Sequence, residues 1–229
     1  MLPIMKKLIK FNFSSGNDIK YIVVHDTANT DKGADAEAHY RYFNGGDRQS
    51  SAHYFVDNKE IVQLVEDYNA SWHCGDGDGR YGITNHNSIG VEICVNCDCD
   101  YDKAVGNAVD LVKFLMKKYS ISIDRVVRHY DASRKICPQS MSADNWQKWW
   151  SLKNRLASGA PAQVSDSQGI TYGTVTAGAL NVRNGAGTNY KIIGQLQRGQ
   201  KVRLDVKVGN WWSIYFGEHG GFVSADYIK

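Results

Sequence analysis

A histidine, a lysine and a cysteine lie close together in the segment RVVRHYDASRKICP, from Arg125 to Pro138. Imidazole nitrogen and thiolate sulfur are both good Zn²⁺ ligands, and a loop between His129 and Cys137 is long enough to fold both onto one ion. Lys135 stands two residues before the cysteine, so its ammonium group would lie beside a metal held there. This segment therefore predicts half of a zinc site.

A second segment decides between a metal site and a plainer interpretation. A single histidine and a single cysteine are more often a core imidazole and a buried thiol than two ligands. However, the run YIVVHDT is continuously apolar and β-branched up to His25, as in a buried strand that delivers a polar side chain to a sheet edge. Three protein ligands, His25, His129 and Cys137, leave a fourth tetrahedral position open, which is typical of catalytic zinc.

Four sequence blocks resemble, in order, those of the zinc-dependent N-acetylmuramoyl-L-alanine amidases of the type-2 amidase and peptidoglycan-recognition-protein superfamily. The blocks are VVHDT (23–27), SAHYFVD (51–57), NSIGVEIC (87–94) and RHYDASRKICP (128–138). The resemblance spans residues 20–156. It implies that His25, His129 and Cys137 bind Zn²⁺ and that Glu92 and Lys135 are catalytic.

Glu92 lies between Val91 and Ile93 in a strand predicted over Ile89–Val95. An unpaired carboxylate is costly inside such an apolar strand, so we expect its side chain to face a polar site. The alternative is a glutamate on a solvated face of the strand. Some relatives carry a tyrosine just before the histidine of the second block, where this chain has Ala52, so the resemblance gives Glu92 the larger role.

The resemblance also implies a mechanism for an amide hydrolase. Zn²⁺ would polarise the carbonyl group and lower the pKa of its water towards ~7. Glu92 would take the proton of the water and pass it to the leaving amine. Lys135 would stabilise the tetrahedral oxyanion.

A glycine-rich loop follows the second block. In the resembling family a Trp-His pair in this loop lines the substrate groove, which assigns Trp72 and His73 to substrate binding, together with Asn87 at the start of the third block. Asp76 and Asp78 in the same loop also suggest a calcium site, but no bidentate glutamate stands at the spacing of an EF-hand. The loop is therefore interpreted as part of the substrate site.

The other cysteines are interpreted as reduced thiols. The chain has five, an odd number, and Cys97 and Cys99 are separated by one residue, which rarely allows relaxed disulfide geometry. Cys94 completes a short cluster with them, but this cluster lacks the distant cysteine pair of a zinc ribbon. We interpret it as structural or incidental.

Residues 1–156 are predicted to form an α/β domain, with a mixed central sheet and flanking helices. The predicted strands cover 20–26, 53–56, 60–65 and 89–95, with the second and third forming a hairpin; the predicted helices cover 35–43, 102–119 and a stretch beginning at Asp144. Asp102 is the expected cap of the second helix. Trp146, Trp149 and Trp150 follow helical spacing in the last helix, which favours core packing over sugar stacking.

The C-terminal part of the sequence shows a different pattern of residues. Residues 157–170 lose all periodicity and are predicted to be a linker. Six short strands are expected over 171–177, 179–183, 190–196, 201–208, 210–216 and 221–223, a pattern typical of a small barrel. Residues 171–229 resemble a bacterial SH3 (SH3b) domain, an SH3-like barrel that usually targets its carrier to the cell wall.

Charge and hydropathy limit the kinds of partner that the protein is expected to bind. The net charge is +3 over 229 residues, and residues 171–229 carry seven Lys and Arg against three Asp and Glu. This positive charge is too diffuse to indicate nucleic-acid binding. The first ten residues mix lysines into their apolar stretch, so we expect no signal peptide and no membrane insertion. The protein is expected to be made in the cytoplasm and to act on bacterial peptidoglycan at the wall.

The sequence thus predicts a zinc-dependent peptidoglycan hydrolase, an endolysin of a phage or prophage or a bacterial autolysin. Two alternatives stay open, namely a peptidoglycan-binding protein of the same fold that does not cut, and a zinc peptidase that cuts within the stem peptide. Non-catalytic members of the recognition-protein branch commonly lack the cysteine ligand, and this chain has Cys137. That residue favours the enzyme.

Overall fold

The computed structural model describes residues 1–157, 171–214, 216 and 220–229. The chain forms two compact units, Met1–Ala143 and Asp144–Lys229. From residue 158 on, the predicted linker lies outside the described residues. The predicted domain limits at 156 and 171 stay predictions.

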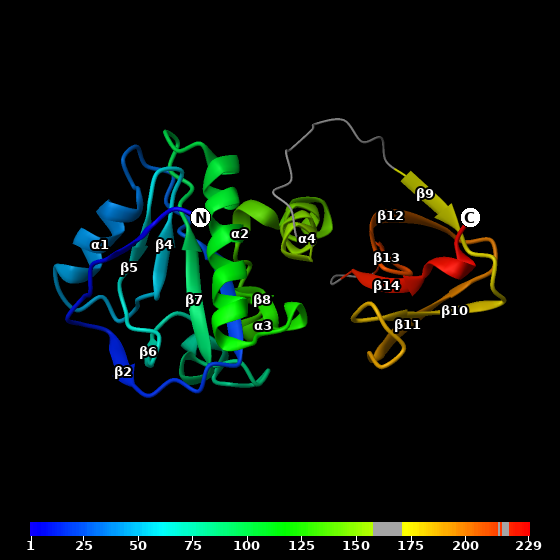
Figure 1. The fold of residues 1–229 in the computed structure, drawn as a ribbon, viewed down its shortest axis with the longest axis horizontal. Coiled ribbons are helices and arrows are strands. Elements are labelled where there is room, and N and C mark those ends of the chain that lie inside the picture. Colours follow the sequence, from blue (N-terminus) through cyan, green and yellow to red (C-terminus); the bar gives the residue numbers. More distant parts are fainter. Residues whose placement is uncertain (158–170, 215, 217–219) are drawn as a thin grey trace. The chain divides into compact units, whose positions relative to one another are not determined.

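A six-stranded mixed sheet forms the centre of the N-terminal unit, in the order β1-β5-β4-β7-β3-β8 (Figure 1). Its strands are β1 (Ile4–Lys6), β3 (Tyr21–Asp26), β4 (Tyr54–Val56), β5 (Ile61–Gln63), β7 (Ser88–Ile93) and β8 (Val126–Arg128). β3 pairs in parallel with both β7 and β8, whereas β4 and β5 form the predicted antiparallel hairpin. The α/β prediction with a mixed sheet is confirmed. β1 and a small separate sheet of β2 (Phe13–Ser15) and β6 (Asn69–Ser71) were not expected.

Two helices of this unit begin at aspartate caps. The first, α1 (Ala36–Asn44), begins after Asp35, whose carboxylate accepts a hydrogen bond from the backbone N–H of Ala38. The second, α2 (Tyr101–Tyr119), begins after Asp100, which accepts from the N–H of Lys103. The predicted cap Asp102 is wrong by two residues, because it already lies in the first helical turn. No described helix is long and apolar enough to cross a bilayer.

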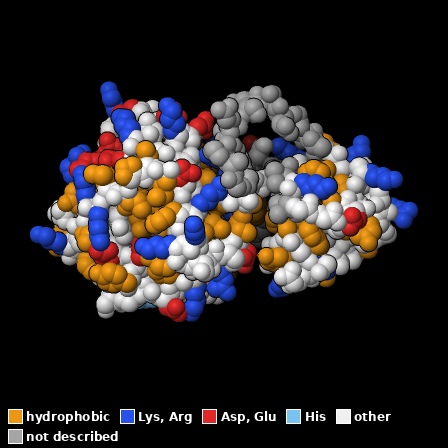
Figure 2. Space-filling view, in the orientation of Figure 1, with side chains coloured by type: hydrophobic (Ala, Val, Ile, Leu, Met, Phe, Trp, Pro, Cys, Tyr) orange, Lys and Arg blue, Asp and Glu red, His pale blue; other side chains and the backbone are white. Residues whose placement is uncertain are grey.

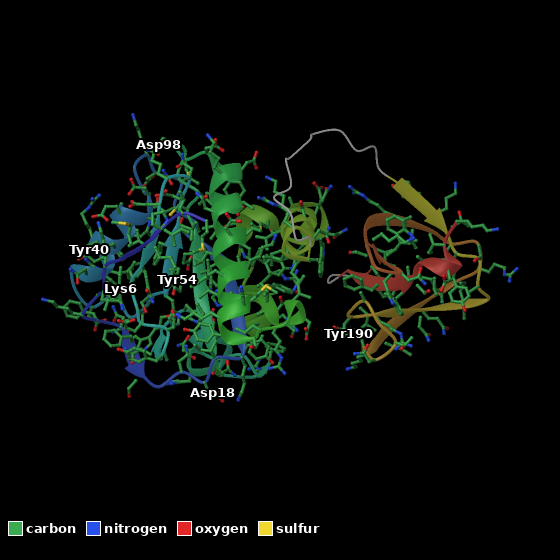
Figure 3. All side chains as sticks on the ribbon, viewed as in Figure 1. Lys6, Asp18, Tyr40, Tyr54, Asp98 and Tyr190 are labelled. Atoms are coloured by element: carbon green, nitrogen blue, oxygen red, sulfur yellow. The ribbon has the colours of Figure 1, made fainter. Side chains whose placement is uncertain are left out.

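The two faces of the sheet have different roles. His25 of β3, Glu92 of β7 and Phe55 of β4 stand in register, so their side chains share one face. α1 packs on this face, where the ring of His39 stacks on Phe55 at 5.0 Å between centroids. α2 packs against β3, β4 and β7, and Figure 1 shows α1 and α2 on either side of these strands. The interior beneath α2 holds Tyr54 (Figure 3), whose hydroxyl donates to the buried Asp67 at 2.7 Å.

The parallel strands bring the predicted chemistry to one edge. β3, β7 and β8 run in the same direction, so their carboxyl ends meet, and such ends are where open α/β sheets bind ligands. His25 and Glu92 are the residues before the last in their strands. His129 directly follows β8 and begins the short helix α3 (His129–Ser133). Figure 1 shows α3 directly after β8.

The C-terminal unit contains the helix α4 and an all-β sheet. α4 (Ala143–Ala157) does not begin regularly at Asp144 as predicted, since residues 144–146 have positive φ angles. Trp146 and Trp149 are buried, in agreement with core packing. The six strands are antiparallel in the order β11-β10-β14-β13-β12-β9 and are β9 (Thr171–Thr174), β10 (Ala179–Arg183), β11 (Ile192–Gln197), β12 (Lys201–Val208), β13 (Trp211–Ile214) and β14 (Gly221–Ser224).

One hydrophobic cluster organises this sheet. Its buried members are Val175, Leu180, Val182, Leu196, Val202, Leu204, Ile214 and Val223. They come from several strands, so the sheet curves around a core of its own. Figure 2 shows Lys and Arg side chains spread over the visible surface of the unit, and Tyr190 lies at its edge (Figure 3). The all-β prediction for residues 171–229 is confirmed.

Candidate active site

A pocket of about 280 Å³ opens at the carboxyl ends of the parallel strands. All five residues predicted to bind metal or to be catalytic line it, namely His25, Glu92, His129, Lys135 and Cys137. They come from β3, β7, the start of α3 and the loop after α3. The fold therefore brings together residues that are up to 112 positions apart in the sequence.

Three of these residues could hold one metal ion. The ligand atoms of His25, His129 and Cys137 all lie within 4.8 Å of one another, and all three residues are buried. Sγ of Cys137 lies 3.6 Å from Nδ1 of His25. Two imidazole nitrogens and one sulfur with an open fourth position are a donor set that suits catalytic zinc.

The hydrogen bonds of the two imidazoles fit this ligand set. Nε2 of His129 lies 2.7 Å from Oδ1 of Asp76, whereas its Nδ1 is buried and has no hydrogen-bond partner among the described residues. Nε2 of His25 lies 3.0 Å from Nδ1 of His73, so its Nδ1 faces Cys137. Each histidine thus engages Nε2 within the protein and presents Nδ1 to the pocket. A ring nitrogen that binds a metal lies buried without a hydrogen-bond partner when no ion is present, as Nδ1 of His129 does here.

Cys137 is held by the loop that returns from α3. Its carbonyl oxygen accepts from the N–H of Tyr130 at 3.1 Å, and its own N–H donates to the carbonyl of Lys135 at 2.8 Å. Burial, followed by the nearby Glu92, raises the pKa of the Cys137 thiol above its ordinary value. The thiol would therefore keep its proton in the absence of a cation, and metal binding would displace that proton.

Glu92 faces the pocket, so the alternative of a solvated strand face is wrong. Its side chain is 18% exposed, and Oε1 lies 3.8 Å from Nδ1 of His25. Oε2 is buried without a hydrogen-bond partner among the described residues. Burial, followed by the charge of Asp26, raises the pKa of Glu92 well above its ordinary value. A carboxyl group of this kind, close to the candidate ligands, is suited to accept and return a proton.

Lys135 lies on the exposed side of the pocket. Burial lowers the pKa values of both His25 and His129, and the positive charge of Lys135 contributes to each shift. Both imidazoles are therefore held neutral, which is the form that binds metal. The ammonium group is also placed to attract an anionic group entering the pocket.

The three residues assigned to substrate have different surroundings. Trp72 lines the pocket, is 37% exposed and donates from Nε1 to Oγ of Ser14. His73 also lines the pocket, but both of its ring nitrogens are engaged inside the protein. Asn87 lies outside the lining, where its side chain accepts from the N–H of Thr84 and donates to the carbonyl of Gly82. A substrate role for these residues stays a prediction.

Sequence reasoning missed two groups behind the pocket. Asp76 was considered only as part of a calcium loop, yet its carboxylate contacts His129. Ser88 lies in the third block, and its hydroxyl contacts His73. Neither contact has a local sequence signal, because the partners are 53 and 15 residues apart.

Two family models match the chain, and curated relatives match its N-terminal part. The N-acetylmuramoyl-L-alanine amidase family (Amidase_2) matches residues 15–140, and the bacterial SH3 family matches residues 178–229. N-acetylmuramoyl-L-alanine amidase XlyA of Bacillus subtilis is 42% identical over 155 residues, which are 68% of this chain and 50% of XlyA. N-acetylmuramoyl-L-alanine amidase CwlH of the same organism is 40% identical over 157 residues, which are 68% of this chain and 60% of CwlH. The chain thus spans only half to three fifths of these curated relatives.

Solved structures resemble the N-terminal part. A mutant endolysin from Bacillus subtilis has a TM-score of 0.62 and 44% identity, and the match covers 68% of this chain and 99% of the endolysin chain. The catalytic domain of XlyA has a TM-score of 0.61 and 41% identity, with coverage of 68% and 99%. The fold and the ordered sequence blocks therefore point to the same family.

Proposed function

The chain belongs to the N-acetylmuramoyl-L-alanine amidase family, and we propose that it hydrolyses the amide bond between N-acetylmuramic acid and L-alanine in peptidoglycan. One observation carries this proposal: two imidazoles and a thiol converge within 4.8 Å at the edge of the sheet, with the partly buried carboxyl group of Glu92 beside them. The test is the identity of the bond that the protein cuts in purified peptidoglycan.

We propose that Nδ1 of His25, Nδ1 of His129 and Sγ of Cys137 hold Zn²⁺. The unpartnered Nδ1 of His129 and the short distance from Cys137 to His25 support this ligand set. Zinc in such a site acts as a Lewis acid, which polarises an amide carbonyl and makes a water molecule more acidic. Membership of the amidase family and the donor set both support zinc as the ion.

The protein side chains have separate tasks in hydrolysis. Glu92 accepts the proton of the attacking water and donates it to the leaving nitrogen of L-alanine, and its Oε1 lies 3.8 Å from Nδ1 of His25, beside the proposed metal site. Lys135 places a positive charge at the pocket, where it stabilises the negative charge that develops on the carbonyl oxygen. Trp72 offers an exposed indole face at the same pocket for contact with the substrate.

The two alternative functions would use the same pocket. A binding protein that does not cut would need neither the thiol ligand nor an unpaired carboxyl group, and the pocket contains both. A zinc peptidase acting within the stem peptide would use the same ligands on a different amide. The bond that is cut therefore separates all three functions.

We propose that the SH3b domain binds the bacterial cell wall and that the protein acts there, as an endolysin or an autolysin. The match to the bacterial SH3 family and the excess of Lys and Arg over Asp and Glu in residues 171–229 support this role. Attachment to an insoluble substrate raises the effective concentration of the active site near its bonds. The domain would thus increase the rate on whole walls and leave the chemistry unchanged.

Removal of the SH3b domain tests this division of labour. A variant comprising residues 1–160 is expected to cleave a soluble muropeptide at a rate within about twofold of the full chain, but to lyse whole cells at least about tenfold more slowly. The rate of amine release and the loss of turbidity measure the two activities. The separately solved catalytic domain of XlyA, which this chain matches over 99% of that domain, supports independent folding of this part.

A full-length Cys137→Ser variant is the control for attachment, because it should bind walls without cutting them. Equal loss of both activities in the truncated protein would contradict the proposal, since it would mean that residues 161–229 complete the active site.

A further inference from the structure

The residues behind the two candidate histidine ligands form two hydrogen-bond paths that the proposed mechanism does not use. We propose that Asp76 positions His129, and that His73 and Ser88 position His25, so that both imidazoles present Nδ1 to the metal. This inference rests on the proposed zinc site. It assigns these three residues a positioning role, with no direct contact with the reacting atoms.

The first path is short and carries a charge. A neutral imidazole has one N–H donor and one acceptor nitrogen, whereas an ionised carboxylate only accepts. Because Oδ1 of Asp76 lies 2.7 Å from Nε2 of His129, that nitrogen carries the hydrogen. Nδ1 of His129 is then left with its lone pair in the buried pocket, where it has no hydrogen-bond partner among the described residues. A carboxylate in this position also makes the imidazole a stronger ligand.

The backbone around Asp76 is built to reach His129. Residues 75–77 form a short 3-10 turn against α3, the helix that begins with His129. A Cβ atom at Gly77 would lie 2.2 Å from the carbonyl oxygen of Ala132, so only glycine permits this approach. The close packing of the turn on α3 thus fixes the distance from Asp76 to the imidazole.

The second path is longer, neutral and buried. Nε2 of His25 lies 3.0 Å from Nδ1 of His73, and Nε2 of His73 lies 3.1 Å from Oγ of Ser88. The Ser88 hydroxyl donates to the carbonyl oxygen of Thr84 at 2.5 Å. Gly90 makes room for the His73 ring, since a Cβ atom there would lie 2.7 Å from it.

The final carbonyl sets the direction of the whole second path. A carbonyl oxygen can only accept, so Ser88 must donate to Thr84 and its oxygen is free to accept from Nε2–H of His73. Nδ1 of His73 then accepts from Nε2–H of His25. Nδ1 of His25 is left with its lone pair, 3.6 Å from Sγ of Cys137. The first path therefore leaves the lone pair on Nδ1 of His129, and the second leaves it on Nδ1 of His25.

The test measures the zinc affinity of the full-length protein by competition with a chromogenic chelator. Asp76→Asn keeps the size of the side chain but removes its charge, and Ser88→Ala removes the acceptor that fixes the His73 tautomer. Each is expected to weaken zinc binding by about 10- to 100-fold, as the loss of such outer partners typically does. Asp78→Asn is the matched control, because it removes an exposed carboxylate of the same loop from a position that asparagine tolerates. Its affinity should stay within about twofold of the original chain.

A spectroscopic measurement on the unmodified protein separates positioning from mere support of the fold. Imidazole ¹⁵N shifts of the zinc-bound chain should show Nδ1 bound to metal and Nε2 bearing hydrogen in both His25 and His129. The downfield N–H signal of His129 should shift in Asp76→Asn, and that of His25 should shift in Ser88→Ala. This readout stays informative if a variant fails to fold.

The possible failures are distinguishable. A protein that binds no zinc at all would overturn the proposed function together with this inference. Zinc binding of ordinary strength in both Asp76→Asn and Ser88→Ala, or coordination through Nε2 of either histidine, would overturn this inference alone.

Discussion

Glu92→Gln is expected to leave a folded protein that binds zinc normally but turns over soluble muropeptide about 10²- to 10⁴-fold more slowly. Glutamine has nearly the shape of glutamate but cannot accept a proton, and general acid–base catalysis usually contributes an effect of this size. Glu92 is not among the three candidate ligands, which already complete an open tetrahedral site. Zinc content, thermal unfolding and the rate of amine release measure the three parts of the expectation.

Glu66→Gln is the matched control for this substitution. Glu66 pairs with Lys6 at 2.5 Å and does not line the active-site pocket, so its rate should be close to that of the original chain. A Glu92→Gln protein that is folded, contains zinc and has a near-normal rate would remove Glu92 from the mechanism.

Cys137→Ser is expected to lose most of the metal from a protein that otherwise carries about one zinc per chain. A serine hydroxyl is a much poorer zinc ligand than a thiolate, and the two remaining imidazoles are too few for a stable site. Sγ of Cys137 lies 3.6 Å from Nδ1 of His25, within the group of candidate ligand atoms. Metal analysis after exhaustive dialysis measures the loss, and activity should fall with the zinc content.

Cys97→Ser is the matched control, because Cys97 is an exposed free thiol outside the candidate ligand group. That variant should keep its zinc. Retention of zinc in Cys137→Ser, with loss of zinc on changing Cys94 or Cys97, would show that the metal site is elsewhere.

The strands that position the site could be predicted because their residues have a strong local pattern. The apolar β-branched run that ends in His25 became β3, and the hairpin of β4 and β5 formed where a turn-forming interval separates two apolar runs. β4 and β5 lie within the longer apolar runs 53–56 and 60–65, whereas β1, β2 and β6 contain or adjoin polar residues and lie in no such run, so no strand was predicted there. The cap of α2 was misplaced because two aspartates stand near the start of the same apolar stripe. Asp100 precedes the helix, whereas Asp102 lies in its first turn.

Some residues of the candidate site could likewise be predicted from the sequence, and others could not. Its ligand types and Glu92 follow from residue chemistry and from the family resemblance, and the structure places them around one pocket. The role of Asp76 could not be predicted, because it depends on the packing of a glycine turn on α3 across 53 residues of sequence. For the same reason His73 was assigned to substrate, although its two ring nitrogens contact His25 and Ser88. Long-range hydrogen bonds leave no periodic signal in a single sequence.

Mass analysis of purified peptidoglycan after digestion tests the central claim most directly. The account predicts stem peptides that begin with a free L-alanine amine, glycan strands that keep intact N-acetylmuramic acid with its lactyl carboxylate, and formation of these products about 10²- to 10⁴-fold more slowly by Glu92→Gln. New amino termini within the stem peptide, with L-alanine still attached to muramic acid, would contradict it and identify a peptidase. Binding to the peptidoglycan without any new amine would contradict it in favour of a non-cutting binding protein.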